Sequence, residues 1–462
     1  MADQPSLPLS DRTGSGTKFG SSGIALTDRQ RVAWLRLWRS ENVGPVTFRQ
    51  LIGHFGSAEA ALEALPEMAA RGGLRKTQHI PSIAEAESEI AHLAKACGKL
   101  AALGEPDYPV MLRRTDDAPP VISYIGDPAV FRLPALAIVG SRNASLAGVR
   151  FTRKLAGEIG TEGYSIVSGM ARGIDTAAHD AALGTGTIAV LAGGLDHPYP
   201  PENIELFKSI PVRGGAVISE MPMGWEPRAK DFPRRNRIIV GLSEAVIMVE
   251  VEAAQRSGSL ISARLANELG RVVFAIPGSP LDPRCEGTNN LIKNGATLVT
   301  GARDILDVLG PMSSLAPPVP FAASEPSHDD LGSVETSDSD RRKILDALGP
   351  TPVHVDELIV YTGATPAQIW LVLLELDIAG RLQRHSGGAS FRPAAHPNIQ
   401  RRPSRRNRRS YPNVQRGPTC SVAAAWIRYT RESVPVLDWD YSWAHLDWGV
   451  QPPFFSFSSY AL

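Results

Sequence analysis

Between residues 136 and 309, short apolar segments alternate with helical stretches and glycine-rich turns. Strands that are apolar on both faces, each followed by a helix or a Gly-rich turn, are typical of a parallel sheet covered on both sides. The sequence therefore predicts an α/β domain with a doubly wound, mostly parallel sheet, and its ligands should bind beyond the carboxyl ends of the strands. In chain order, the seven segments are LAIVG, YSIVSG, TIAVLAGG, AVISE, AVIMVE, VVFAIPG and ATLVTG.

Length and composition limit the class of protein. With 462 residues, 43% of them hydrophobic and 21% charged, the chain can bury a large core and should divide into two to four units. It has no run of about 18 apolar residues, and its first residues lack the build of a secretory signal, so a cytoplasmic protein without membrane contact is expected. The three cysteines lie far apart without CxxC or nearby histidine ligands, which argues against disulfides and zinc.

Composition also divides the chain into regions. The Ser- and Gly-rich leader and the C-terminal tail should be disordered, and the Pro-, Ser- and Asp-rich stretch between them has the composition of a linker. The tail holds an arginine run and then half of the tryptophans, without periodicity; it is either a nucleic-acid arm or a non-adaptive extension. The expected regions are a leader (1–26), a helical domain (27–105), the sheet domain (106–311), a linker (312–340), a compact C-terminal unit (341–393) and the tail (394–462).

Two small helical units flank the predicted sheet. In the first, apolar periodicity before and after the turn Val43-Gly44-Pro45 predicts two short helices, which form either a packing domain or a helix-hairpin-helix that touches DNA backbone. In the second, three helical segments followed by a hairpin at Gly387-Gly388 predict a winged helix. Its third helix, at 369–376, is too apolar to read a groove well, which favours a protein-contact or weak DNA role.

A basic segment, RAKDFPRRNR at 228–237, places five cations and one aromatic ring within ten positions. Cations can follow phosphates while the ring of Phe232 offers a face to an unstacked base, a mixture that suits single strands. Because 48 basic and 48 acidic residues cancel over the whole chain, affinity for a polyanion has to come from such a local patch.

The first predicted strand ends in a turn suited to anions. Gly140 allows close approach of backbone, Ser141 offers a hydroxyl, and Arg142 offers a planar fork for phosphate near the start of a helix. The turn lacks the G-x-G-x-x-G pattern, and the second strand closes with Ser168-Gly169 where a ribose-binding carboxylate is expected, so NAD binding is not favoured and no cofactor is expected.

Further glycine-rich turns follow other strands: SGMARGID, AGGLDHPYP, and QRSGSLISA with Ser257, Gly258 and Ser259. Together they would line one rim of the sheet with backbone N–H groups that an extended polyanion could touch. Asp175 and His179, spaced i and i+4, are either an acid–base pair or a carboxylate that orients a histidine. No metal or ATP motif is present, so neither catalytic residues nor a metal are predicted.

These motifs resemble the DNA-processing protein A family, DprA, also called Smf. The resemblance covers residues 110 to 310 almost continuously and agrees with a helical (SAM or helix-hairpin-helix-like) domain before the extended Rossmann-like sheet and a winged helix after it. It is carried by VGSRNAS, SGMARGIDTAAHDAAL, AVLAGGLDHPYPPEN, GAVISEMP, FPRRNRIIVGLS, VEVEAAQRSGSLISARLANELGR and FAIPGSPLDPRCEGTNNLIKNGATLV.

The resemblance implies a non-catalytic protein that binds and protects incoming single-stranded DNA during natural transformation and helps to load the RecA recombinase. It also implies a homodimer formed through the end of the sheet domain, in a region that includes Leu291, Ile292 and Leu298. The DNA-binding residues that it implies are Arg142 of the Gly-Ser-Arg motif, Lys230, Phe232, Arg235, Asn236 and Arg237 of the basic segment, and Ser168, Gly169, Arg172 and Gly173 of the second turn.

Two other functions remain open at this point. One is a nucleotide-processing enzyme on the same scaffold, similar to phosphoribohydrolases; their Pro-Gly-Gly-x-Gly-Thr-x-x-Glu signature has no counterpart here, because AQRSGSLISA lacks the carboxylate. The other is an adaptor whose winged helix binds a protein partner and whose α/β domain binds a small nucleotide.

Overall fold

The computed structural model describes residues 26–313 and 336–391, apart from residues 75, 254–257 and 386–387. Nearly all of the leader, most of the linker and the whole tail lie outside the described residues, so the disorder predicted for the leader and the tail stays a prediction. Ser257 of the third predicted turn and Gly387 at the predicted hairpin tip also lie outside the described residues.

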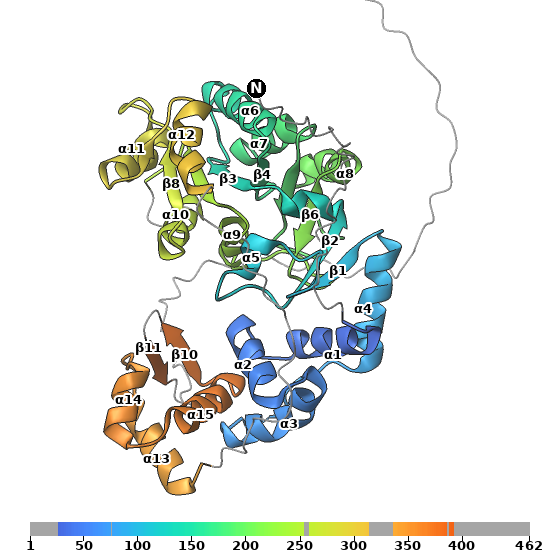
Figure 1. The fold of residues 1–462 in the computed structure, drawn as a ribbon, viewed down its shortest axis with the longest axis vertical. Helices are drawn as coiled ribbons and strands as arrows, with labels where there is room; N and C mark the ends of the chain where they lie inside the picture. The colour runs from blue at the N-terminus through green and yellow to red at the C-terminus, as the bar shows by residue number, and fades with distance from the viewer. Residues whose placement is uncertain (1–25, 75, 254–257, 314–335, 386–387, 392–462) are drawn as a thin grey trace, which may run out of the picture. The chain divides into compact units, whose positions relative to one another are not determined.

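Residues 99–298 form a nine-stranded sheet with the order β1-β2-β6-β5-β4-β3-β7-β8-β9 (Figure 1). All neighbours among β3 to β9 are parallel, while β2 pairs antiparallel with β6 and with β1. The doubly wound, mostly parallel class is confirmed. The strands are β1 (Lys99–Ala102), β2 (Val121–Gly126), β3 (Ala135–Gly140), β4 (Ser165–Ser168), β5 (Thr187–Val190), β6 (Ala216–Ser219), β7 (Ala245–Val249), β8 (Val272–Ala275) and β9 (Thr297–Leu298).

The two antiparallel strands, β1 and β2, were not among the seven predicted. β1 lies within 27–105, the range expected to be helical, and pairs in register with β2 from Lys99 opposite Tyr124 to Ala102 opposite Val121. The seven predicted segments lie in the regular strand–helix alternation between 136 and 309, whereas β1 and β2 precede it and are joined by a connection that holds only the four-residue α5. The sheet therefore begins earlier in the chain than residue 106.

The alternating direction of side chains along the strands explains why both faces of the sheet are covered. In β3, Leu136 and Ile138 join the core under α6, α7 and α12, whereas Ala137 and Val139 join the core under α9 and α10. Successive side chains of a strand point to opposite faces, so an unbroken apolar strand supplies two cores. The helices of this domain are α5 (Val110–Arg113), α6 (Leu146–Thr161), α7 (Ile174–Ala182), α8 (Ile204–Val212), α9 (Asp231–Gly241), α10 (Gly258–Glu268), α11 (Glu286–Lys293) and α12 (Ala302–Ser313).

The N-terminal domain is helical, as predicted. Its helices are α1 (Asp28–Arg39), α2 (Pro45–Phe55), α3 (Ala58–Arg71) and α4 (Ile83–Lys95). The tight turn that the sequence predicts lies between α1 and α2: Gly44 is the N-cap of α2 and Pro45 occupies its first position, where the missing N–H would have no helical partner. Trp34 packs edge-on against Phe48 across this hairpin, with ring centroids 5.0 Å apart.

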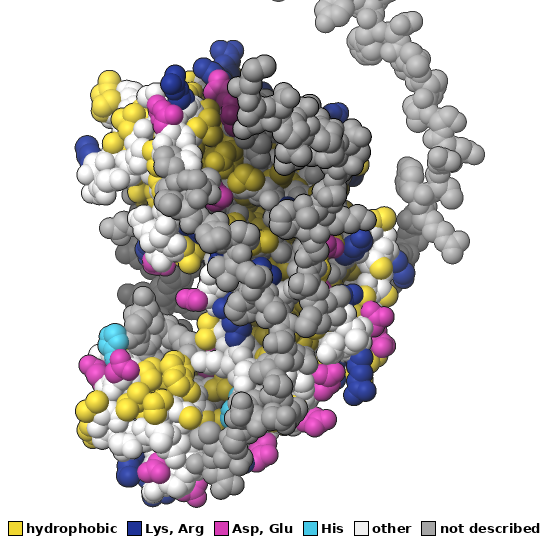
Figure 2. Space-filling view, viewed as in Figure 1, with side chains coloured by type: hydrophobic (Ala, Val, Ile, Leu, Met, Phe, Trp, Pro, Cys, Tyr) yellow, Lys and Arg dark blue, Asp and Glu magenta, His cyan; other side chains and the backbone are white. Residues whose placement is uncertain are grey.

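The C-terminal unit contains α13 (Asp338–Ala347), α14 (Val355–Thr362), α15 (Pro366–Ile378) and the antiparallel pair β10 (Leu382–His385) and β11 (Gly388–Phe391). This is the predicted winged helix. Figure 2 shows hydrophobic side chains gathered over this part of the chain, at the lower left, and Val360 and Tyr361 of α14 are exposed. Among the described residues, no single helix is long and apolar enough to cross a membrane, although α14 and α15 together, bent by 119°, satisfy the criteria of length and composition.

The third helix of the winged helix, α15, is buried on two sides. Ile369, Val372 and Leu373 pack inside the winged helix, whereas Leu374 and Ile378 belong to the core of the N-terminal helices. A helix that is apolar all round belongs in an interior. Polar contacts fix the same face: Thr47 donates to Asp377 at 2.7 Å, Asn42 donates to the carbonyl of Ile378 at 3.0 Å, and Arg381 donates to the carbonyl of Gly72 at 3.0 Å.

Leu374→Asp is expected to separate α15 from the N-terminal helices, because it forces a charge into a site that is only 3% exposed. Hydrogen exchange should become faster in α2, α3 and α15 and stay unchanged in the parallel strands. Val360→Asp, at a position 85% exposed on the same unit, is the matched control. Unchanged exchange in α2 and α3 of the Leu374 variant would contradict the described packing.

Candidate nucleic-acid interface

A cleft of about 530 Å³ opens at the carboxyl ends of β3 and β7. The chain builds the sheet outward from β3 through β4, β5 and β6, and then returns to the other side of β3 with β7. The gap between β3 and β7 is therefore the topological switch point, where open α/β sheets bind ligands. The cleft is lined by residues of the turn after β3, the turn after β7, α9 and the start of α10.

Arg142 and Phe232 meet at this cleft although they are 90 positions apart. The guanidinium carbon of Arg142 lies 5.4 Å from the ring centroid of Phe232, which is a cation–π distance. Arg142 is exposed and Phe232 is partly buried, and both line the cleft. The turn after the first predicted strand and the basic segment thus form one surface.

Helix α9 divides the basic segment between two faces. Phe232, Arg235 and Asn236 are spaced i, i+3 and i+4, so they share one side of the helix, and all three line the cleft. Lys230 is exposed at the N-cap of α9, beside Ala229, which also lines the cleft.

Arg235 lines the cleft but is buried, with only 5% of its surface exposed to solvent. It donates to the carbonyl of Val190 at 2.6 Å, and its guanidinium lies so close over Gly169 that any side chain there would overlap it. Burial lowers the pKa of Arg235 to about 10, with neighbouring Asp175 opposing the shift, so the side chain is still a cation at neutral pH. Its Nε is buried and has no hydrogen-bond partner among the described residues.

Arg237, predicted to face DNA, points away from the cleft. It forms an ion pair with the carboxylate of Glu220, which is 2% exposed, and donates to the carbonyl of Asp117. Arg234 reaches the other oxygen of Glu220 at 3.1 Å. Sequence reasoning missed Glu220, since an acidic residue at a strand end carries no signal for the arginines it will neutralise.

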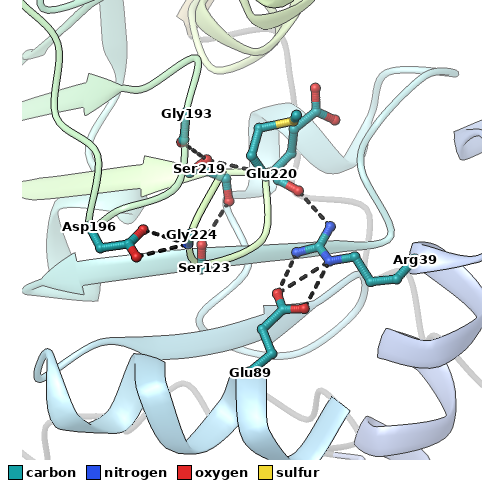
Figure 3. A network of polar contacts seen from close by, with 9 residues as sticks. Arg39, Glu89, Ser123, Gly193, Asp196, Ser219, Glu220 and Gly224 are labelled. Carbon is teal, nitrogen blue, oxygen red and sulfur yellow. Dashed lines mark hydrogen bonds and ion pairs between the residues drawn. The ribbon is translucent and has the colours of Figure 1, made fainter. Parts of the chain in front are cut away.

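The loop around Glu220 also ties the sheet domain to the N-terminal helices (Figure 3). Arg39 of α1 donates to the carbonyl of Glu220 at 2.8 Å and forms a fork-shaped pair with Glu89 of α4. Ser219 donates to the carbonyl of Gly193 at 2.6 Å, and Asp196 accepts from the amide of Gly224 at 2.8 Å. The helical domain thereby holds the segment that leads into α9.

The residues of the second predicted turn lie next to the cleft and differ in role. Ser168 is buried and donates to the carbonyl of Ile138 at 2.7 Å, which joins β4 to β3. Gly173 has a φ of 79° and lies against the backbone of Ser141 and Arg142, where a side chain would overlap. Arg172 is exposed and lies 3.7 Å from Glu202. The second turn therefore mainly supports the backbone of the first turn, and its exposed Arg172 is the residue that faces solvent.

The third predicted turn contributes its described part to the cleft. Ser259 donates to the carbonyl of Gly140 at 3.2 Å, and Asn236 donates to the carbonyl of Gly258 at 3.0 Å. These bonds join the start of α10 to β3 and α9. Ser141, the remaining residue of the first turn, accepts from the amide of Asn143 at 3.0 Å and shapes the turn that carries Arg142.

The N-terminus of α6, expected to attract a phosphate, already holds a carboxylate. Glu250, just after β7, accepts hydrogen bonds from the amide and the hydroxyl of Ser145, the N-cap of α6. Its carboxylate lies so close to Gly148 that a side chain there would overlap it. An anion at this point satisfies the positive end of the helix, so a nucleotide diphosphate has no place there. Glu250 was missed by sequence reasoning; its position directly after a strand at the switch point was the available signal.

Asp175 and His179 do not form an acid–base pair. Asp175 accepts from the amides of Gly169 and Ala171 at 3.1 and 3.2 Å, so it orders the second turn. His179 contacts the hydroxyl of Thr187 at 2.7 Å; because that hydroxyl donates to Ile166, the histidine is the donor. Burial, with a smaller effect of Arg235, lowers the pKa of His179 to about 3, which keeps the ring neutral at physiological pH.

Two further groups of predicted residues lie elsewhere. Leu291 and Ile292 are partly buried on α11 against the sheet core, and Leu298 is 46% exposed on β9, the edge strand of the sheet. Among the described residues, no group of three or more His, Cys, Asp or Glu is arranged to hold a metal.

Comparison with known proteins decides the family. The model of DNA recombination-mediator protein A matches residues 99–310, and a DprA-like N-terminal HHH domain and a DprA winged helix domain match 28–92 and 323–388. Protein Smf from Synechocystis is 32% identical over 401 residues, covering 78% of this chain and 98% of that protein. The chain belongs to the DprA/Smf family. The family that the motifs predict is thus confirmed.

A second protein named Smf agrees with this assignment. Protein Smf from Escherichia coli is 36% identical over 370 residues, covering 79% of this chain and 96% of that protein. The X-ray structure of DNA processing protein A from Streptococcus pneumoniae is 36% identical with a TM-score of 0.49, covering 62% of this chain and 98% of that one.

His179→Gln is expected to make folding stability less sensitive to acid. The folded-state pKa of about 3 lies below the ordinary 6.5, so the unfolded chain takes up a proton as pH falls through 6.5 while the folded chain does not. The free energy of unfolding of the wild type should drop by about 2 kcal/mol between pH 7 and pH 5 from this group alone.

Urea unfolding followed by circular dichroism at the two pH values measures this difference. His92→Gln, on the exposed side of α4, is the control and should behave as the wild type. An identical loss of stability on acidification in the wild type and the His179 variant would contradict the assignment.

Proposed function

We propose that this protein binds single-stranded DNA, protects incoming DNA and helps to load RecA during natural transformation. The observation that carries the proposal is the meeting of Arg142 and Phe232 at the switch-point cleft. An exposed cation beside an aromatic face is the pair of groups that an unpaired nucleotide needs: one for the phosphate and one for the base.

The distribution of charge supports a strand at this cleft. Among the described residues, Arg142 and Lys230 have no carboxylate within 4.0 Å, whereas Arg234 and Arg237 share the buried Glu220. Cations that are already neutralised release no counterions when DNA binds, so the two unpaired ones provide the electrostatic contacts.

The same geometry favours binding over nucleotide chemistry. Glu250 occupies the helix terminus where a nucleotide phosphate would bind, and Asp175 and His179 serve the turn and the sheet. A binder needs no general acid or base, and the cleft residues that face solvent are suited to contact rather than to proton transfer.

Family membership supports the proposed assembly. A recombination mediator acts beside a recombinase in the cytoplasm, and RecA is the partner proposed here. For a homodimer, the exposed edge strand β9 with Leu298, and the neighbouring Leu291 and Ile292, provide apolar surface at the end of the sheet domain.

Arg142→Ala should weaken binding of a single-stranded oligonucleotide and flatten its salt dependence. Removal of one phosphate contact lowers the slope of log K against log salt by about 0.7 for single strands. Filter binding at several salt concentrations measures both quantities. Arg150→Ala, at an exposed arginine on α6, is the matched control; an Arg142 variant with wild-type affinity and slope would count heavily against the proposal.

A chain that ends at residue 393 should retain its preference for single-stranded over double-stranded oligonucleotides. The proposed contacts all lie between β3 and α10, and the arginine run of the tail adds only charge, which attracts both forms. A gel-shift comparison of the full chain and the shortened chain tests this. Loss of single-strand binding in the shortened chain would move the site out of the cleft.

A further inference from the structure

A second aromatic ring lies beside Phe232. The ring centroid of Tyr199 is 5.6 Å from that of Phe232, and the two rings are inclined at 65°. Arg142 lies on Phe232 at 5.4 Å, so Arg142, Phe232 and Tyr199 form a continuous row. They come from three separate segments, the turn after β3, the first turn of α9 and the loop after β5. We call these three residues the aromatic row.

The loop that carries Tyr199 is firmly held. The amide of Gly194 donates to the carbonyl of Trp225 at 2.9 Å, and Asp196 accepts from the amide of Gly224 (Figure 3). Despite this, 49% of Tyr199 is exposed. A tyrosine that served only to fill the core would be covered, whereas this one presents a large, amphipathic ring on an ordered support.

We propose that Tyr199 is a second base-stacking position, so that a single strand runs from the switch-point cleft over Phe232 and on to Tyr199. The inference rests on the proposed binding of single-stranded DNA and adds a position that the basic segment does not contain. Because the rings are inclined at 65°, one base cannot lie flat on both, and neighbouring bases of the strand must splay apart. The row follows the carboxyl ends of β3 and β5, which lie at the same edge of the parallel sheet.

The alternative role for Tyr199 is to support the ring of Phe232 from the side without touching DNA. Two substitutions separate the roles. Tyr199→Phe keeps the aromatic face, and Tyr199→Leu keeps apolar bulk beside Phe232 but removes the face on which a base stacks. If Tyr199 stacks on a base, the leucine variant is weakened; if it only supports Phe232, the leucine variant binds as the wild type does.

The experiment titrates homothymidine oligonucleotides of about 4 to about 16 nucleotides against the full chain and its variants. Tyr199→Phe should bind as the wild type does. Tyr199→Leu and Tyr199→Ala should lose between about 5-fold and about 150-fold in affinity, the range of one base–aromatic stack. The loss should appear only above the length at which a strand fixed at Phe232 reaches Tyr199, and the salt slope should not change because no phosphate contact is removed.

Photocrosslinking gives a direct readout. A strand with one 5-iodouracil, moved along its length, should crosslink to Tyr199 from a position next to the one that crosslinks to Phe232, as mapped by mass spectrometry. Wild-type affinity of Tyr199→Leu at every length, a loss that is equal at all lengths, or crosslinks to Phe232 alone would overturn the proposal.

Different results would contradict the proposed binding of single-stranded DNA itself. In that case the wild type does not bind single strands, or Arg142→Ala does not weaken binding. If Arg142→Ala weakens binding while the Tyr199 variants behave as the wild type, only the second stacking position is wrong. Should Tyr199→Ala fail to fold, as judged by circular dichroism, the phenylalanine and leucine variants carry the test.

Discussion

The candidate interface depends on the way α9 is fastened to the sheet by two arginines, one buried and one partly buried. Arg235 lies over Gly169 beside Asp175, and Arg237 is paired with Glu220, a carboxylate with 2% exposure. Removing one partner of such a buried pair leaves an uncompensated charge, which destabilises a protein by about 3–5 kcal/mol. The helix is therefore held in one rotational setting. That setting turns Phe232 toward the cleft and fixes its distance from Arg142.

Much of the fold and of the candidate interface could be predicted from the sequence. The predictions that failed did so for identifiable physical reasons. The seven parallel strands were predictable because burial on both faces leaves unbroken apolar segments. The antiparallel strands β1 and β2 precede the repeating strand–helix pattern, with only the four-residue α5 between them, and were missed. The spacing of Phe232, Arg235 and Asn236 places them on one side of α9. The spacing could not show that Arg237 points away from the cleft, because its partner Glu220 lies 17 positions earlier and only the folded loop brings them together.

Glu250 shows how this chain places one of its own carboxylates at a helix N-terminus. It accepts hydrogen bonds from the amide and the hydroxyl of Ser145, the N-cap of α6. This carboxylate satisfies a positive helix end that a sequence motif alone suggests is open to phosphate. A glycine-rich turn before a helix therefore indicates an anion site, but does not say whether the anion is a ligand or a side chain. In this chain, the cleft between β3 and β7 is the site that we propose for the ligand.

Because the chain has no net charge, few cations are available to bind the phosphates of a polyanion. Of the basic segment, Arg234 and Arg237 are neutralised internally and Arg228 stacks on Trp225 at 4.0 Å, so that few cations remain for phosphates. Each phosphate contact on a single strand contributes about 0.7 to the salt slope, and two contacts give a shallow dependence. Stacking on aromatic faces, at about 1–3 kcal/mol per base, depends little on salt. On the proposed function, the aromatic row supplies more of the affinity for a single strand than the two unpaired cations of the cleft do.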